Sequence, residues 1–176
     1  MKKNLSLLIV AAIAGMASAA SIDWTLKGSS FTTSDGSATR AYNYLVVAIL
    51  ESDLNSAVSA ISTINTDSST FASYVKSTGT TAKTGATSGS FTVSQDSGVS
   101  IPLVLIAFDA DNYTDAKNYL VSGTETGVTY EPPSTPTTAT FNSASYSGKS
   151  WTAVPESSTA ALALAGLALL LKRRKA

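Results

Sequence analysis

The sequence predicts a mainly β domain, most simply a single β-sandwich, with one helical excursion; a compact α+β domain is the alternative. Residues 42–50 and 101–108 are apolar nearly throughout and partly β-branched, which is typical of central strands buried on both faces. Ile22, Trp24 and Leu26 alternate with polar residues, as in a strand with one buried face. These three segments favour packed sheets over a helical fold.

Weaker patterns mark the shorter strands and the turns between them. Ser97-Gly98 is a turn signal, and residues 80–89 hold no apolar residue larger than Ala, which favours a loop or a soft edge hairpin. Further strands are expected within residues 21–39, 90–93, 118–121 and 139–141.

Helical periodicity appears in one part of the chain only. Ser52 is expected to cap a helix whose apolar stripe consists of Leu54, Ala57, Val58, Ile61 and Ile64. A second short helix is expected over residues 69–77, with Phe71, Tyr74 and Val75 facing inward and Gly79 ending it. The helices together span residues 52–64 and 69–77.

The two central strands resemble each other in sequence. Residues 45–53 and 103–111 each contain a buried strand followed by an acid-x-Asp step. Two central strands of one sheet explain this likeness without an internal duplication.

The charge of the chain is unevenly distributed. The sequence has 12 basic and 12 acidic residues. Six of the cations lie at the two ends, at Lys2, Lys3 and residues 172–175, whereas all the acids lie between residues 23 and 156. The body between the ends is therefore acidic, near −6, which argues against a nucleic-acid partner because such a partner requires a basic face.

The residue types that are missing limit the chemistry. The chain has no His and no Cys, so His-based catalysis, His-ligated metals, Cys nucleophiles and disulfides are excluded. A glycosidase-like site would need two facing carboxylates, and no pattern places two acids across a cleft. We therefore expect a non-enzymatic protein without a cofactor, rich in Ser and Thr hydroxyls that are candidate glycan acceptors.

One acidic cluster is a weak candidate for calcium. Asp109, Asp111 and Asp115 follow a predicted rigid strand, and Ca²⁺ takes oxygen ligands. Their spacing departs from the EF-hand pattern, with Tyr113 at the fifth position and Thr114 in place of the glycine. A solvated, capped turn is the alternative, and we favour it.

The N-terminus has the three parts of a secretory signal peptide. Lys2 and Lys3 precede an apolar segment at residues 5–16 and a small-x-small step at residues 17–19. Cleavage is expected after Ala19, with Ala20 as the alternative; the recognised small residues are Ala17, Ala19 and Ala20.

The C-terminus has the composition of a short membrane helix with a basic stop. Residues 160–171 are uncharged and almost entirely Ala and Leu, and as a helix they would be about 18 Å long against about 30 Å of hydrocarbon. The lipid-facing residues include Ala160, Leu162, Leu164, Leu167 and Leu171. The cations Lys172, Arg173, Arg174 and Lys175 follow, and positive charge beside an apolar helix stays on the cytoplasmic side. By length alone, a buried core helix is the alternative.

Val154, Pro155 and Glu156, followed by hydroxyl residues, the Ala/Leu run and the basic end, resemble the PEP-CTERM sorting signal of exosortase substrates. The resemblance covers residues 154–176, and it departs from the family where Ser157 replaces a second proline. It implies an exported bacterial protein from an organism that makes extracellular polysaccharide. Its implied partner is a membrane-embedded cysteine transpeptidase, the exosortase, that cuts at the motif and moves the body towards the cell surface. A plain C-terminal anchor is the alternative.

These segments give the expected organisation. It comprises a signal peptide (1–19), a mainly β extracytoplasmic domain (20–131), a Pro/Ser/Thr-rich bridge with a candidate last strand (132–153) and the sorting signal (154–176). Trp151, at the end of the bridge, is interpreted as a core residue rather than an interfacial one.

The expected function is that of an exported surface or extracellular-matrix protein, held at the inner membrane before processing. A carbohydrate- or Ca²⁺-binding adhesion module with the same signal is the alternative, with extracellular polysaccharide as its partner. Exposure of Tyr113, Tyr119 and Tyr130 on one face would favour that alternative, and their burial would favour a structural role.

Overall fold

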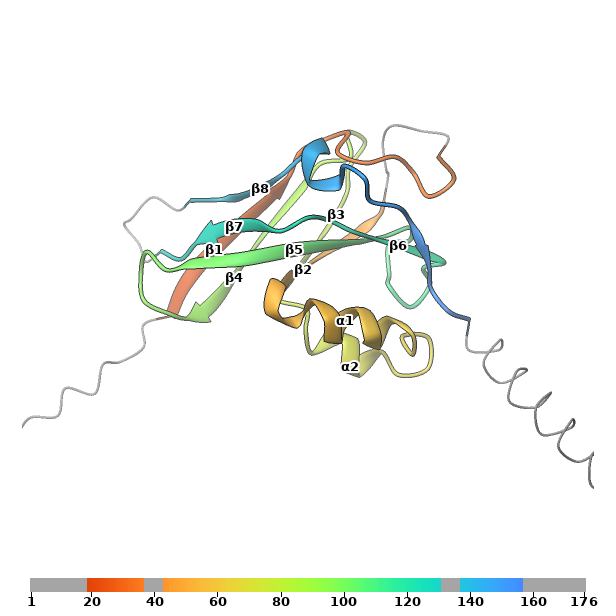
Figure 1. Cartoon of the computed structure of the whole chain (residues 1–176), viewed down its shortest axis with the longest axis horizontal. Coiled ribbons are helices and arrows are strands. Elements are labelled where there is room, and N and C mark those ends of the chain that lie inside the picture. The colour runs from red at the N-terminus through yellow and green to blue at the C-terminus, as the bar shows by residue number, and fades with distance from the viewer. Residues whose placement is uncertain (1–18, 37–42, 131–136, 157–176) are drawn as a thin grey trace, which may run out of the picture.

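The computed structural model describes residues 19–36, 43–130 and 137–156, and in these ranges the protein is mainly β, as predicted (Figure 1). The described strands form a three-stranded sheet of order β4-β1-β8, here the small sheet. Its strands are β1 (Ala19–Leu26), β4 (Thr87–Ser94) and β8 (Ala139–Phe141). They also form a six-stranded sheet of order β3-β2-β5-β6-β9, with β7 paired to β5, here the large sheet. Its strands are β2 (Leu45–Leu50), β3 (Ser77–Thr80), β5 (Ser100–Phe108), β6 (Asn118–Val121), β7 (Glu125–Val128) and β9 (Thr152–Ala153).

The two strongly apolar segments are neighbours at the centre of the large sheet. β2 and β5 pair antiparallel, with Leu45 opposite Phe108 and Leu50 opposite Leu103. Both strands bury side chains on both faces, which explains why their sequences are apolar without alternation. The likeness between the two segments therefore reflects their shared position in one sheet.

One face of these central strands meets the small sheet across what we call the inter-sheet core. Its buried members are Ile22, Trp24, Leu26, Phe31, Val46, Ala48, Leu103, Leu105, Ala107, Leu120, Ala139, Phe141 and Tyr146. Trp24 lies at its centre, and its indole Nε1 donates a hydrogen bond to Ser77 Oγ at 2.6 Å. Gly89 allows the ring to approach, because a Cβ there would lie 2.8 Å from it.

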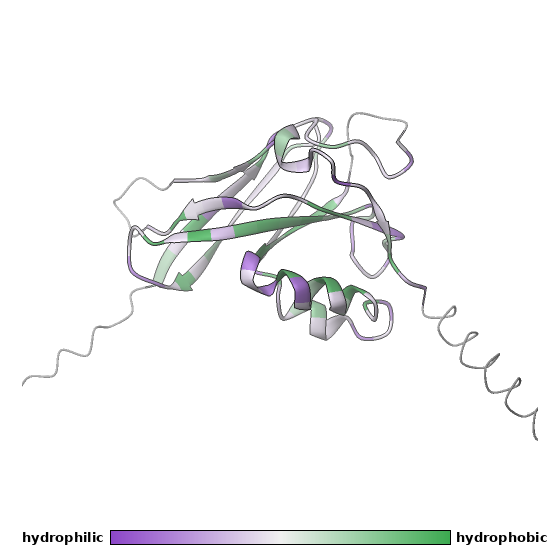
Figure 2. Ribbon diagram, viewed as in Figure 1, coloured by the Kyte–Doolittle hydropathy of each residue, from purple (hydrophilic) through white to green (hydrophobic). Residues whose placement is uncertain are grey.

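The opposite face of the large sheet is covered by helices, giving what we call the helix-side core. A 3-10 turn, η1 (Glu51–Asp53), leads into α1 (Leu54–Ile61), and α2 (Ser68–Ala72) lies beside it (Figure 1). The buried members of this core are Leu45, Val47, Ile49, Ala57, Ala60, Ile61, Ile64, Phe71, Val104, Ile106, Phe108, Ala116 and Val154. Figure 2 shows the hydrophobic residues along β5 and in α1 that supply this packing. The predicted apolar stripe is confirmed, with Leu54 and Val58 partly buried at its edge.

The ends of the two helices differ from the prediction. Ser52 lies inside η1, and Asp53 occupies the N-cap of α1 without a side-chain hydrogen bond. The second helix stops at Ala72 instead of continuing to residue 77. The chain then enters the large sheet, where Lys76 N–H donates to the carbonyl oxygen of Ala48 and Gly79 belongs to β3. Pairing with β2 therefore outweighs helical propensity after α2.

Several strand boundaries also differ. Within residues 21–39 there is one described strand, β1, and the described residues after it form a loop. β4 is longer than predicted and takes in the last three residues of the range 80–89. It lies in a different sheet from β3, so the two do not form a hairpin. β7 was not predicted. The turn at Ser97-Gly98 is present, and Gly98 has a φ of 84°.

The expected bridge at residues 132–153 is part of the folded body from residue 137 onwards. β8 pairs parallel with β1, placing Ala139 opposite Trp24 and Phe141 opposite Leu26. A 3-10 helix, η2 (Ser143–Tyr146), follows behind a capping box at Asn142. β8 was predicted, but the short apolar groups spaced among Ser and Thr after it gave too little periodicity to reveal η2 and β9. Residues 131–136 lie outside the described ranges.

Both predicted targeting helices also lie outside the described residues. Among the residues that the structure describes, no helix has the length and apolar character needed to cross a bilayer. The start of β1 and the last described residues after β9 lie at opposite ends of the long axis of the body (Figure 1).

Candidate functional site

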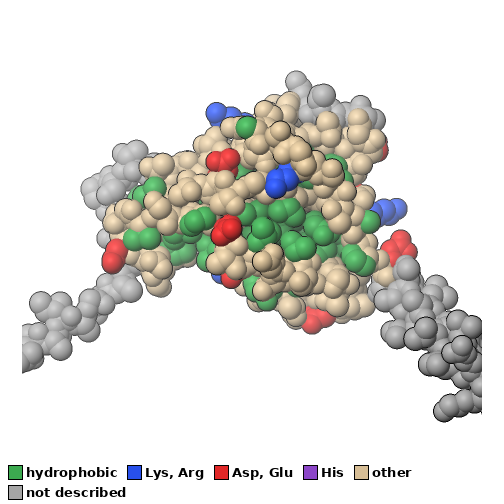
Figure 3. Space-filling view, in the orientation of Figure 1, with side chains coloured by type: hydrophobic (Ala, Val, Ile, Leu, Met, Phe, Trp, Pro, Cys, Tyr) green, Lys and Arg blue, Asp and Glu red, His purple; other side chains and the backbone are tan. Residues whose placement is uncertain are grey.

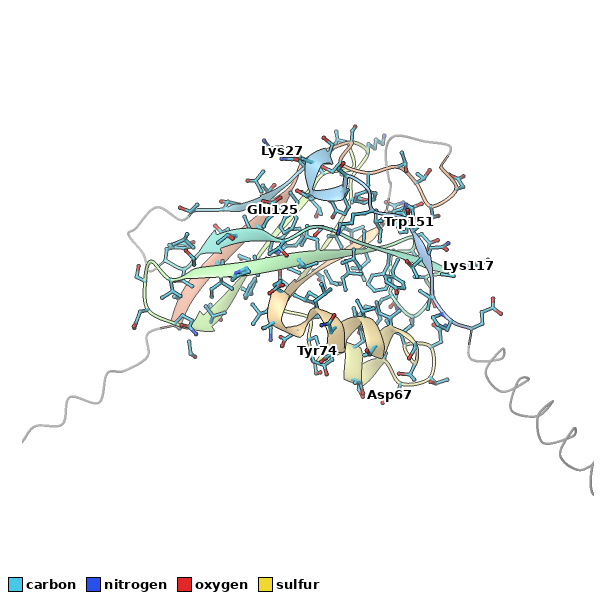
Figure 4. The ribbon with its side chains drawn as sticks, in the orientation of Figure 1. Lys27, Asp67, Tyr74, Lys117, Glu125 and Trp151 are labelled. Carbon is cyan, nitrogen blue, oxygen red and sulfur yellow. The ribbon has the colours of Figure 1, made fainter. Side chains whose placement is uncertain are left out.

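The candidate site is the C-terminal end of the described body, at β9 and the first residues of the predicted sorting motif. β9 is the edge strand of the large sheet and pairs antiparallel with β6, with Ala153 opposite Asn118 and Thr152 opposite Tyr119. The backbone N–H of Val154 extends this ladder by donating to the carbonyl oxygen of Lys117 at 2.8 Å. Figure 4 shows Trp151 and Lys117 at this end of the body.

This segment is attached to both cores, through Trp151 on one side and Val154 on the other. Trp151 packs partly buried against the inter-sheet core, and its Nε1 donates to the carbonyl oxygen of Thr32 at 3.0 Å. Its ring meets Phe31 and Tyr44 edge-on, at centroid distances of 5.8 and 5.5 Å. Three residues later, Val154 is 5% exposed and belongs to the helix-side core. The interpretation of Trp151 as a core residue is thus supported, since its ring packs against those of Phe31 and Tyr44.

The three residues of the predicted sorting motif differ in burial. Val154 is buried, whereas Pro155 and Glu156 are exposed. Asn65, in the connection after α1, donates from Nδ2 to the carbonyl oxygen of Pro155 at 3.4 Å. The predicted membrane residues 160–171 and the cations 172–175 lie outside the described ranges, so the structure describes only the first part of the predicted signal.

The turn that receives Val154 is organised by Asp109. Its carboxylate accepts hydrogen bonds from the backbone N–H groups of Lys117 and Asn118, at 2.8 and 2.9 Å, and from the Asn118 side chain at 2.7 Å. Burial alone would raise the pKa of Asp109, but the hydrogen bonds from Asn118 and Lys117 together outweigh it and hold that pKa below its ordinary value. The carboxylate thus stays ionised and fixes the strand end that carries the Lys117 carbonyl.

The structure does not gather the three carboxylates that were considered for calcium. Asp111 and Asp115 are exposed, and Asp109 is engaged by the backbone of its own loop. Among the described residues, no group of three or more acidic side chains is placed to hold a metal ion. The arrangement at Asp109 is that of a capped turn.

The described residues begin at the position where signal-peptide cleavage is expected. Ala19 is the first residue of β1 and is exposed, whereas Ala20 is fully buried and pairs with Val93 of β4. Ala17 lies outside the described residues. The first buried residue of the body therefore comes directly after the expected cleavage position.

The three tyrosines that would have indicated a saccharide platform are half-buried. Tyr113 and Tyr119 pack against the helix-side core, and Tyr113 meets the ring of Phe71 at a centroid distance of 5.2 Å. Tyr130 pairs through its backbone with Ser21 of β1. Tyr113 and Tyr119 therefore contribute to core packing, and the three rings come from separate parts of the described fold.

The described surface includes the following two hollows. One, of about 370 Å³, lies on the outer face of the small sheet and is lined mainly by Asp23, Thr25, Ser88, Ser90 and Thr138. The other, of about 430 Å³, lies against α1 and α2. On the face seen in Figure 3, hydrophobic side chains gather across the middle of the body and charged side chains are few and scattered.

The residues that hold the predicted motif have no recognisable pattern in the sequence. Asn65, Lys117 and Asn118 act through backbone atoms or a single amide, and a strand of two residues has no detectable period. None of the protein families, curated proteins or solved structures compared with this chain matches it.

Proposed function

We propose that this chain is an exported, non-enzymatic cell-surface or extracellular-matrix protein, with a β-sandwich-like body that is anchored and sorted through a C-terminal exosortase-type signal. In this proposal the helix at residues 160–171 spans the inner membrane, the body stands outside, and the cations at 172–175 remain in the cytoplasm. A membrane transpeptidase then cuts near Pro155 and passes the body to the surface. No nucleic acid or cofactor takes part.

The observation that supports this proposal most directly is the extent of the folded body. Among the described residues, the buried ones run from Ala20, the first residue after the expected signal-peptide cleavage, to Val154, the first residue of the predicted sorting motif. Apart from Val154, the two described cores consist of residues that lie between the two predicted targeting segments. The uneven charge, with an acidic body between basic ends, agrees with the proposed orientation.

Intact mass of the mature protein tests the proposal. We expect residues 1–19 to be absent, together with the residues beyond the Pro155 region, and we expect deletion of the exosortase-type gene to restore the C-terminal part. Finding residues 172–176 on all mature protein would leave an anchored protein and reject cleavage.

The topology is tested by Arg173→Glu/Arg174→Glu, which should impair retention of the body at the membrane because the cytoplasmic cations are lost. The matched control is Lys83→Glu/Lys149→Glu, the same charge change at exposed positions of the body. Equal membrane fractionation of the two variants would contradict the proposed orientation.

A second candidate is a polysaccharide-binding adhesion module with the same sorting signal. It is favoured by the hollow on the small sheet, where hydroxyl groups surround Asp23. Retention of the body on the producer's own extracellular polysaccharide, lost in Asp23→Ala and Ser90→Ala, would support this candidate. Equal retention of these variants and the unchanged chain would reject the hollow as the binding site.

A further inference from the structure

The residue that begins the sorting motif is also a core residue of the body. Val154 is 5% exposed, its side chain belongs to the helix-side core, and its N–H is bonded to Lys117. Residues 151–155, here the docked segment, are held further by Trp151 and by the amide of Asn65. An enzyme that meets the folded protein finds Pro155 and Glu156 accessible but not Val154.

Proteins that recognise peptides in extended form use main-chain hydrogen bonds and pockets for alternate side chains. In the docked segment the Val154 side chain and N–H are already occupied by the body. Only residues 155–159 separate Val154 from the predicted membrane helix, and these five residues span at most about 17 Å. A membrane-embedded enzyme therefore has little chain to bind while the segment remains docked.

We propose that the docked segment must leave β6 and the helix-side core before the transpeptidase can bind the sorting motif, so that the stability of this docking controls the rate of processing. This inference rests on the proposed sorting function. The physical basis is that β9 contains two residues and lies at a sheet edge, and such elements open locally far more often than the whole fold unfolds.

The segment is attached at two separate points, which explains how it could open without unfolding of the body. Trp151 is held in the inter-sheet core and Val154 in the helix-side core, with the exposed Thr152 and Ala153 between them. Release of residues 152–154 from β6 and the helix-side core would free the motif while Trp151 still holds the chain. The body would then stay folded during processing and would be delivered intact.

A reversible crosslink tests this. Asn118 and Ala153 lie directly opposite in the antiparallel ladder, which places their Cα atoms at about 4.5–5.5 Å, within the range of a disulfide. The natural chain has no Cys, so Asn118→Cys/Ala153→Cys introduces one possible intramolecular pair. The purified full-length variant is incubated with membranes that contain an exosortase-type transpeptidase, and release of the C-terminal fragment is followed by mass.

We expect the oxidised variant to be processed at least about tenfold more slowly than the same variant after reduction. Asn118→Cys alone loses the side-chain bond to Asp109 without a crosslink, and should be processed at least as fast as the unchanged chain. Thr25→Cys/Ser88→Cys joins a directly opposed pair of the small sheet, and its oxidised form should be processed like the unchanged chain.

The outcomes separate the two proposals. Equal rates for the oxidised and reduced Asn118→Cys/Ala153→Cys variant would overturn this inference and leave the sorting function standing. Absence of processing of the unchanged chain in these membranes would overturn both.

Hydrogen exchange gives a readout that does not depend on the enzyme. The Val154 amide should exchange at least about a hundredfold more slowly than an unstructured amide, and the oxidised crosslink should slow it further. Exchange of Val154 at the rate of an unstructured amide would show that the segment is not docked in solution and would overturn the inference.

Discussion

The two faces of the central strands β2 and β5 are covered by different kinds of structure. The inter-sheet core is closed by the small sheet, whose strands come from residues 19–26, 87–94 and 139–141. The helix-side core is covered mainly by the helical segment at residues 51–72. The turn after β5 and the side chain of Val154 complete it. One face thus depends on contacts between distant parts of the chain, and the other mainly on adjacent ones.

This difference has a consequence for the proposed function. The inter-sheet core contains no residue of the sorting motif, although Trp151 packs against its edge. The helix-side core contains Val154. Damage to the first core should therefore lower the stability of the whole body, whereas damage to the second should also expose the motif.

The largest effect is expected from Trp24→Ala in the inter-sheet core. The side chain is 1% exposed and loses its bond to Ser77, and truncation of a buried aromatic residue costs about 4 kcal/mol. Urea unfolding should show a lower midpoint with an unchanged slope. A loss below about 1 kcal/mol would show that the two sheets do not depend on this residue.

Phe71→Ala makes the corresponding change in the helix-side core, with an expected cost of about 3 kcal/mol. Phe71 is fully buried and meets Phe108 and Tyr113 edge-on, at centroid distances of 5.5 and 5.2 Å. Hydrogen exchange at Val154 should accelerate more in this variant than in Trp24→Ala when both are compared at equal global stability. Equal acceleration of Val154 exchange in the two variants would show that the helix-side core has no special role in holding Val154.

The sequence predicted the elements whose own residues show a complete hydrophobic pattern. The runs that became β2 and β5 are apolar because both faces are buried, and the stripe from Leu54 to Ile64 is periodic because α1 packs on one side only. β6 and β8 were predicted at their observed positions, residues 118–121 and 139–141.

What could not be predicted depends on partners elsewhere in the chain. Gly79 ends no helix because Ser77–Thr80 pairs with β2, and no local signal reports that pairing. β9 has two residues, and its position is fixed by β6 and by the burial of Val154. At the candidate site, sequence patterns predicted a motif at residues 154–156, and only tertiary packing shows which of its residues are buried and which exposed.

The smallest effect is expected from Asp109→Asn, at the turn that supports the helix-side core and the docked segment. The variant keeps one accepting oxygen but places an NH2 group near backbone donors. This change should lower the free energy of unfolding by about 1 kcal/mol at pH 7. The pKa of Asp109 lies below its ordinary value of 3.8, so the folded state favours the charged form. Its contribution to stability is complete above that ordinary value and is lost as the pH falls through the lower, folded-state pKa.

The difference in unfolding free energy between the unchanged chain and Asp109→Asn should therefore be constant from pH 7 to about pH 5 and shrink below pH 4. Urea unfolding across this range measures it, and Asp111→Asn, an exposed neighbour, is the control without an expected effect. A difference that persists unchanged at pH 2 would mean that Asp109 acts through its shape rather than its charge. In that case the turn would hold Val154 equally well in acid, and the docking of the motif would be insensitive to pH.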